Sequence, residues 1–204
     1  MSRPGTFERV YAAIKAQLRE GRFRPGDRLE PASLCEDLNA SVTPVRDALH
    51  RLAGERLVET PRHEGFRAPA LTETILRHLY AWHLDLLLLA MMRRSTERLP
   101  AIDEPGVPSP HFEQQNRLFE RMVQAGGNPE HVHALRNAVE RLEPVQRLEA
   151  LFLDAVEPET DRIVRAIRDH DRKGLRSSLL RYHRRRQQIV PELIAKLCEQ
   201  RADS

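Results

Sequence analysis

The sequence is poor in the residues on which several protein classes depend. Its 204 residues include two cysteines, one tryptophan and nine glycines, and aromatic residues make up 5 %. Cys35 and Cys198 lie far apart and neither belongs to a CxxC pair, which argues against a disulfide framework or a cysteine-bound metal. Both fall in apolar helical patterns, so we expect two buried thiols.

Long uncharged apolar runs are also missing. The most apolar stretch, Leu84 to Met92, contains Asp85 and is closed by Arg93 and Arg94. It is shorter than the roughly 18 uncharged residues that a membrane span needs. Charged residues recur from Arg3 onward, so the N-terminus lacks the apolar core of a secretory signal. We therefore expect a cytoplasmic protein with no membrane partner.

Neither sign of charge is in large excess. Lys and Arg number 33 and Asp and Glu number 30, which gives a formal net charge of +3. Charge alone therefore does not indicate a nucleic-acid partner. A 31 % share of charged residues with few glycines and aromatics is typical of a helix-rich soluble protein, and the length allows two small domains.

The first seventy residues predict two helices joined by a turn. The first helix is indicated by five apolar residues at helical spacing before Gly21, namely Phe7, Val10, Tyr11, Ile14 and Leu18. A Pro-Gly turn within residues 23–29 follows. The second helix is expected at about Pro31 to Asn39, and its apolar residues Leu34, Cys35 and Leu38 should be buried.

A third helix and a hairpin complete this region. Ser41 is placed to cap the third helix, and Pro44 lies near the helix start, where a missing N–H costs nothing. The expected inner stripe is Val45, Ala48, Leu49 and Leu52, and the expected outer face is Thr43, Arg46, Asp47 and His50. Residues 57–60 and 65–68 are predicted to form two short strands around the turn 61–64, as a β-hairpin wing.

This order of elements is typical of a winged helix-turn-helix. In such domains the third helix enters the major groove of double-stranded DNA and the wing lies along the backbone or minor groove. Arg46 points outward near the helix start, where its guanidinium could bind guanine O6 and N7 together. Ser41 and Thr43 suit phosphate contacts. A solvated surface arginine remains the alternative interpretation of Arg46 taken alone.

Residues from about Val10 to Ala68 resemble the GntR family of bacterial regulators. The matching segments are Pro25-Gly26-Asp27-Arg28-Leu29, residues 41–49 (SVTPVRDAL), Arg51-Leu52, Leu57-Val58 and Gly65-Phe66. The resemblance implies DNA contacts from Ser41, Thr43 and Arg46 and from the wing residues His63 and Gly65.

The candidate DNA-binding set also includes Val42, His50 and Arg62. Val42 stands where the family commonly has an arginine, and its apolar side chain could meet a thymine methyl group. We therefore expect an operator unlike the family's usual one.

From residue 71 onward the sequence predicts helices alone. They are expected at about 72–98, 111–125, 129–155, 158–170 and 172–200, with a loop over 99–110. Pro144 and Pro191 should each kink or split a helix. The predicted fold is mainly α, with a winged helix-turn-helix domain at 1–70 and an all-helical effector-binding and dimerisation domain at 71–204.

Three segments of this second region resemble the FadR-like (FCD) branch of the same family, namely residues 73–84, 125–129 and 163–171. The resemblance implies a helical bundle that dimerises and, in many members, binds a metal and a small organic acid. The metal-ligand positions of that branch, an aspartate and three histidines, fall here on Gln115, Phe119, Thr160 and either Tyr182 or His183. With at most one imidazole left we expect no family-type metal and no other cofactor.

The remaining candidate effector residues follow from the same positions. His83 replaces the arginine of the branch's first helix, and Leu87 replaces the glutamate four residues later. The candidate effector pocket is therefore formed by His83, Gln115, Phe119, Thr160, Tyr182 and His183, the alternative being hydrogen-bonded interior or surface histidines. The run Arg181 to Arg186 is interpreted as a solvated helix face, with a patch for nucleic acid or an acidic partner as the alternative.

The sequence as a whole predicts a homodimeric, sequence-specific DNA-binding transcription regulator. Apolar residues encircle much of the helix at 84–92, so part of it should pack between protomers. A two-fold dimer predicts a near-palindromic operator. By family analogy it acts as a repressor, with an uncharged or weakly acidic small-molecule effector or none.

Three other functions are alternatives to this one. No nucleophile–base pair, phosphate loop or paired carboxylates stand out, so we expect no enzyme. A metal-dependent small-molecule sensor with a conventional FCD site remains if the histidines converge. A winged-helix protein-interaction module that has lost operator recognition is the third.

Overall fold

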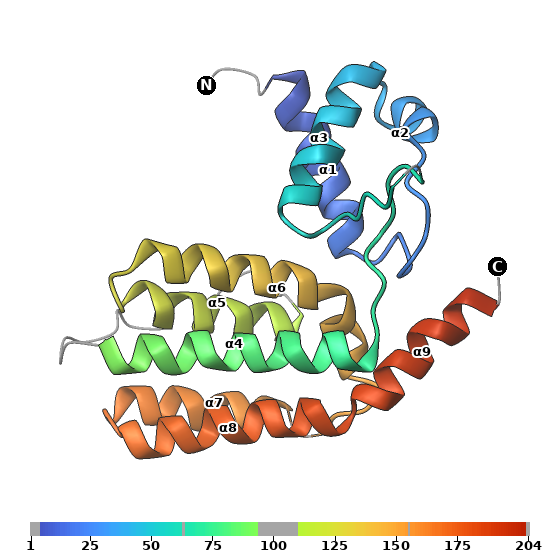
Figure 1. The fold of residues 1–204 in the computed structure, drawn as a ribbon. Helices are drawn as coiled ribbons and strands as arrows, with labels where there is room; N and C mark the ends of the chain where they lie inside the picture. The colour runs from blue at the N-terminus through green and yellow to red at the C-terminus, as the bar shows by residue number, and fades with distance from the viewer. Residues whose placement is uncertain (1–4, 63, 94–109, 155, 203–204) are drawn as a thin grey trace. The chain divides into compact units, whose positions relative to one another are not determined.

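A computed structural model describes residues 5–62, 64–93, 110–154 and 156–202 (Figure 1). It divides the chain into two compact units, one formed by residues up to Thr72 together with those from Ala195 onward, the other by Glu73–Ile194. Within the described residues the fold is mainly helical, as the sequence predicted.

The first unit contains three helices, α1 (Thr6–Arg19), α2 (Pro31–Leu38) and α3 (Val42–Gly54). Helices α1 and α2 both pack against α3. The buried side chains of α1 and α3 are the predicted ones: Val10, Ile14, Leu18, Val45, Ala48, Leu49 and Leu52. In α2 only Leu34 is fully buried, whereas Cys35 and Leu38 are half-buried.

The turn between α2 and α3 is fixed by one unusual backbone conformation and one side chain. Asn39 ends α2 in the left-handed region, with φ 46° and ψ 60°, which asparagine tolerates better than most residues. The Arg9 guanidinium of α1 donates to the Leu38 carbonyl at 2.8 Å. A cation at this helix end satisfies a carbonyl that has no partner within the helix.

The predicted wing strands are wrong within the described residues, where the structure forms isolated bridges instead. Glu59 and Arg67 exchange two backbone hydrogen bonds, and Arg28 bridges Arg67 from the other side. In this register the next hydrogen-bonded pairs would be 57–69 and 61–65. Each contains a proline, Pro69 or Pro61, which has no N–H to donate. The ladder therefore stops after one pair.

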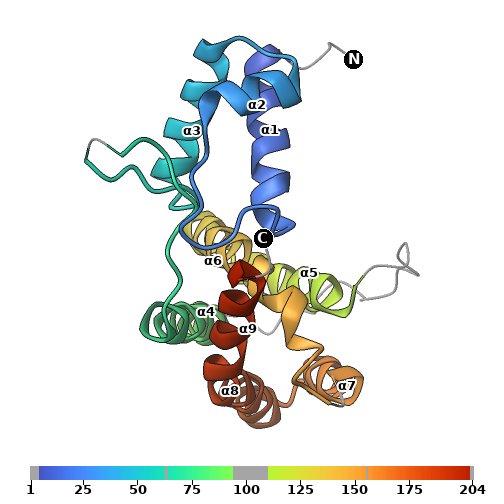
Figure 2. The same cartoon turned by 90° about the vertical axis from the view of Figure 1, so that its right-hand side faces the viewer.

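The second unit is a helical bundle made of α4 (Glu73–Arg93), α5 (His111–Gln124), α6 (Pro129–Glu149), α7 (Val156–Arg168), α8 (Arg172–Gln188) and the start of α9 (Val190–Ala202). Figure 2 views this bundle nearly end-on. Helix α4 is central, since it packs against α5, α6 and α8, and α7 packs against α8. This arrangement turns one face of α4, α5, α7 and α8 toward a shared interior.

The two prolines have different outcomes. Pro191 lies at the second position of α9, so the predicted long helix over 172–200 is split into α8 and α9. Pro144 lies inside α6, which continues through it. Residues 94–98 of the first predicted helix of this region, and 99–109 of the predicted loop, lie outside the described residues.

Two further expectations concern burial and membranes. Cys35 is half-buried and Cys198 is exposed, so the prediction of two buried thiols is wrong. By length and composition α4 is apolar enough to cross a membrane, but its inner residues pack within the bundle, and the core helix of a soluble protein passes the same test.

Candidate functional sites

The first candidate site is the outer face of α3. Ser41, Val42, Thr43, Arg46 and His50 are all exposed there, on the side opposite the buried stripe. Val42 is 51 % exposed, which is unusual for an apolar side chain of its size in this unit. Among the described residues Arg46 takes part in no ion pair, which leaves its guanidinium uncommitted.

The start of α3 is less tightly capped than the sequence predicted. Ser41 occupies the N-cap position with extended backbone angles, φ −76° and ψ 164°, but its hydroxyl makes no capping hydrogen bond. The amides of Val42 and Thr43 have no partner within the helix at this end. Several donors thus lie together at one helix end, and such groups can bind an anion.

The wing is held against α3 by an aromatic contact. The His50 ring meets the Phe66 ring edge-on, with centroids 4.9 Å apart. Arg62 is exposed in the turn, and Gly65 has a φ of +77°, where glycine is favoured. His63, the other predicted wing residue, lies outside the described residues.

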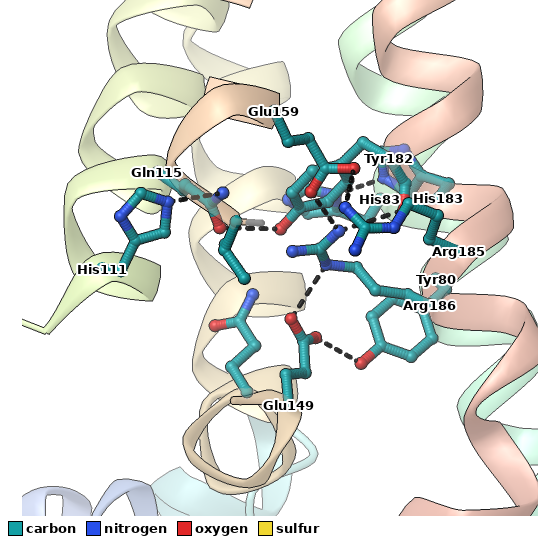
Figure 3. Close-up of polar contacts among 12 residues, drawn as sticks. Tyr80, His83, His111, Gln115, Glu149, Glu159, Tyr182, His183, Arg185 and Arg186 are labelled. Atoms are coloured by element: carbon teal, nitrogen blue, oxygen red, sulfur yellow. Dashed lines mark hydrogen bonds and ion pairs between the residues drawn. The ribbon is translucent and has the colours of Figure 1, made fainter. Parts of the chain in front are cut away.

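The second candidate site lies inside the helical bundle, where the structure brings all six predicted effector residues together. Figure 3 shows four of them, His83, Gln115, Tyr182 and His183. His83 of α4 contacts His183 of α8, with Nδ1 and Nε2 2.8 Å apart. The Gln115 amide donates to the Thr160 hydroxyl at 2.7 Å. The Phe119 ring lies 5.4 Å from the His83 ring and 5.1 Å from that of Tyr182. His111, which the sequence did not single out, lies 2.9 Å from the Thr160 hydroxyl.

The centre of this cluster is a buried arginine that the sequence interpretation missed. Arg186 is fully buried and forms ion pairs with Glu149 and Glu159, both at 2.9 Å. Its guanidinium carbon lies 3.3 Å from the centroid of the Tyr182 ring. The Tyr80 hydroxyl donates to Glu149 at 2.6 Å (Figure 3). Three charges are therefore buried together as ion pairs.

The prediction that residues 181–186 form a solvated face is wrong for half of them. Tyr182, His183 and Arg186 are buried, whereas Arg181 and Arg184 are exposed. The spacing of the buried three, at i, i+1 and i+4, is that of one helix face. That spacing is the signal that could have placed Arg186 beside the two predicted pocket residues.

Burial controls the protonation of the cluster. It lowers the pKa of His183 to about 4 and that of His83 well below its ordinary value, where the neighbouring imidazole and Arg186 add to the effect. Burial also raises the pKa of Glu149, against the opposing charge of Arg186. Although burial alone favours the neutral guanidine, the charge of Glu149, with Tyr182 and Glu159, raises the pKa of Arg186. At neutral pH both imidazoles are therefore uncharged.

The residues at the four family metal positions do not fit a divalent ion. They supply an amide, a phenyl ring, a hydroxyl and either a phenol or one imidazole. Both nitrogens of that imidazole, His183, are engaged, Nδ1 with the Leu179 carbonyl and Nε2 with His83. Within the described ranges no group of three His, Cys, Asp or Glu side chains could hold a metal.

Comparison with known proteins finds a family match in the first unit. Residues 6–67 match the family model of the gntR family of bacterial regulatory proteins. The chain is 38 % identical over 77 residues to the Nta operon transcriptional regulator of Aminobacter aminovorans, which covers 38 % of this chain and 34 % of that protein. It is 33 % identical over 78 residues to the HTH-type transcriptional regulator McbR of Escherichia coli, covering 38 % and 35 %. These matches span about a third of each relative's length.

Solved structures extend the similarity of fold to the whole chain. McbR/YncC of Escherichia coli has a TM-score of 0.62 at 24 % identity and covers 97 % of this chain and 99 % of its own. A structure from Rhodococcus sp. RHA1, named as a putative transcriptional regulator GntR, has a TM-score of 0.75 at 16 % identity, covering 91 % of this chain and 97 % of its own. Both curated relatives are named as transcriptional regulators. Residues 6–67 of the chain are therefore similar to the gntR family of bacterial regulatory proteins, and the whole chain shares its fold with solved regulators.

Proposed function

We propose that this protein is a cytoplasmic homodimeric repressor that binds a near-palindromic operator through α3 and the wing. The observation that carries this proposal is the outer face of α3, which exposes Arg46 beside the uncapped helix start within the part of the chain that matches the gntR family. Phosphate contacts near Ser41 and Thr43 would position the helix, and Arg46 would bind a guanine. The FCD-like helical unit would supply the dimer interface.

Val42 supports a departure from the family's usual operator. Its side chain is half exposed at the first turn of α3, two residues before Pro44 and on the same face as Arg46. An isopropyl group there can contact a thymine methyl but cannot donate a hydrogen bond to a base or phosphate. The operator would therefore carry an A·T pair at this position, next to the base pair that Arg46 contacts.

Genome-fragment selection with the purified full chain tests the proposal. A palindromic site should be enriched, and its affinity should fall steeply with added salt. The Arg46→Ala variant should lose about tenfold to a hundredfold in affinity for that site, as expected when a bidentate base contact is removed. Arg176→Ala, which removes an exposed arginine of α8, should leave it unchanged.

Val42→Arg should change which sequence is preferred, and not only the strength of binding. A flat enrichment profile, or equal losses from Arg46→Ala and Arg176→Ala, would instead favour a winged-helix module that does not recognise an operator.

We further propose that the helical unit needs no metal. The guanidinium of Arg186 lies in ion pairs with Glu149 and Glu159, so a side chain of the protein is the cation that compensates these buried carboxylates. A metal-dependent sensor would require a converging set of imidazoles and carboxylates, which the residues around Thr160 and His183 do not provide. One tightly held divalent ion per chain, measured on protein purified without a histidine tag, would contradict this.

A further inference from the structure

Three buried polar atoms of the described part of the bundle make no hydrogen bond. Nε of Arg186 and Oε1 of Glu159 lie in ion pairs, whereas Nε2 of His83 does not. His83 is 1 % exposed, and its Nε2 atom is enclosed without a hydrogen-bond partner among the described residues. A buried polar atom without a partner costs free energy, and such atoms are rare in folded proteins. The remaining polar groups of the cluster around it are mostly committed to one another (Figure 3).

The hydrogen bonds of the two histidines determine what this nitrogen offers. The Nδ1 of His183 lies 2.8 Å from the Leu179 carbonyl, which can only accept, so Nδ1 carries the proton. Because His183 is neutral at physiological pH, its Nε2 is then an acceptor. The Nδ1 of His83, 2.8 Å away, must donate to it. His83 is also neutral, so its Nε2 carries no proton and can only accept a hydrogen bond.

The charges nearby argue against an anionic ligand. Arg186 is already paired with two carboxylates, and Arg185 lies 3.3 Å from the other oxygen of Glu159. The two neutral imidazoles add no positive charge. An incoming carboxylate or phosphate would therefore have to displace Glu149 or Glu159 from the buried arginine, which would leave an uncompensated charge in the bundle.

Aromatic rings lie beside His83. The Phe119 ring meets its imidazole edge-on, and the Tyr182 ring packs against both Phe119 and His183. We propose that this site binds an uncharged small molecule with an apolar body, which donates one hydrogen bond from a hydroxyl or N–H group to Nε2 of His83. This inference rests on the proposed role of the protein as a regulator with an effector domain.

Access to the site requires side chains of the bundle to move, because His83 is enclosed. The apparent affinity is then reduced by the fraction of molecules in the open state. Millimolar concentrations of small probes are therefore appropriate. Phenol and cyclohexanol carry a donor on an apolar ring, anisole has a similar ring without the donor, and benzoate carries a charge.

The experiment is titration of the full chain with these four probes in the absence of DNA, followed by thermal unfolding and by nitrogen NMR of the imidazoles. Phenol and cyclohexanol should raise the Tm saturably and shift the His83 Nε2 resonance. Anisole should bind about tenfold more weakly than phenol, because the buried acceptor stays unsatisfied. Benzoate should cause neither effect.

Variants distinguish binding at this site from nonspecific binding of the probes. His83→Leu should abolish the preference for phenol over anisole, whereas His133→Leu, at an exposed histidine of α6, should preserve it. If His83→Leu fails to fold, the NMR shift in the unaltered protein still shows whether phenol binds at Nε2 of His83. Equal binding of phenol and anisole, tighter binding of benzoate, or no response to either alcohol would overturn the inference. Failure of operator binding with intact phenol binding would count against the proposed function alone.

Discussion

At the scale of single residues, the most consequential side chain is Arg186. Its charge is compensated by Glu149 and Glu159, and each of these carboxylates depends on the guanidinium in return. Replacing Arg186 by methionine keeps most of the volume but leaves the buried Glu149 without a counter-charge and Glu159 paired with Arg185 alone. We expect a loss of about 3–5 kcal/mol in the free energy of unfolding, measured by urea denaturation.

The control for this prediction is Arg176→Met, which changes an exposed arginine of the same helix and should cost little. Adding Glu149→Gln and Glu159→Gln to Arg186→Met should recover part of the stability, because the uncompensated charges are then removed. If Arg186→Met alone costs no more than Arg176→Met, the buried ion pairs do not stabilise the bundle.

The buried histidines make stability depend on pH. Because burial lowers the pKa of His183 from its ordinary 6.5 to about 4, the unfolded chain binds more protons than the folded one between these values. His183 therefore contributes stability above about pH 6.5, and this contribution is lost as the pH falls toward 4. His83 acts in the same direction. Glu149, whose pKa is raised, opposes them near the lower end.

Comparison of variants isolates the contribution of His183. Urea unfolding at several pH values between 4.5 and 7.5 should show stability that rises with pH in the unaltered protein. His183→Gln should flatten this rise, and His133→Gln should leave it unchanged because His133 is exposed. An identical pH dependence in all three proteins would mean that His183 is protonated equally in the folded and unfolded chains.

At the scale of elements, the sequence predicted the helices of the winged domain well and its wing poorly. Helices α1 and α3 were found because their apolar residues repeat at helical spacing over several turns, a local signal that tertiary structure only reinforces. The wing strands failed because Pro61 and Pro69 remove the N–H groups on both sides of the Glu59–Arg67 pair. The alternation of apolar residues that predicted the strands does not reveal that these N–H groups are missing.

The interior of the helical unit was predicted only in part. Sequence resemblance selected six residues that the fold brings together, since their positions depend on helix alignment. It did not find Arg186, because an arginine within a basic run is usually solvated. Its burial depends on Glu149 and Glu159, which come from two other helices. Such partners can be recognised only once the helices are packed.

Gly65 offers a test of the wing as an element. Its φ of +77° is costly for a residue with a side chain, yet a Cβ atom there would meet no heavy atom within 4 Å. Gly65→Ala should therefore cost about 1–2 kcal/mol in the free energy of unfolding, from backbone strain alone. Gly54→Ala, at the end of α3 with equal space but no positive φ, should be neutral or stabilising. Equal effects would show that the wing relaxes to another conformation.

At the scale of the whole molecule, the two units differ in how their relationship to known proteins is supported. The gntR match falls within the first unit and the curated relatives match over 77 and 78 residues, whereas similarity across the full chain rests on fold at 24 % identity or less. Similarity of sequence therefore supports the first unit, and similarity of fold alone supports the whole chain.

The proposed assembly of two copies concerns the whole molecule. Helix α4 exposes Ile75, Trp82 and Leu89 at intervals of seven residues, with Met92 at the same face, and Trp82 is 45 % exposed. Such a stripe along a helix is the seam by which helices associate. We expect sedimentation analysis to find a dimer that Trp82→Glu converts to monomer, because the new carboxylates would lie between apolar surfaces.

The matched control is Leu151→Glu, which places the same charge at a 63 % exposed leucine away from this stripe. It should remain dimeric, and circular dichroism should show equal helix content in both variants. Trp82→Glu should also lose affinity for the full palindrome while binding an isolated half-site as before, since each recognition helix is unchanged and only the simultaneous engagement of two half-sites is lost. A dimer that survives Trp82→Glu would move the interface to another face of the molecule.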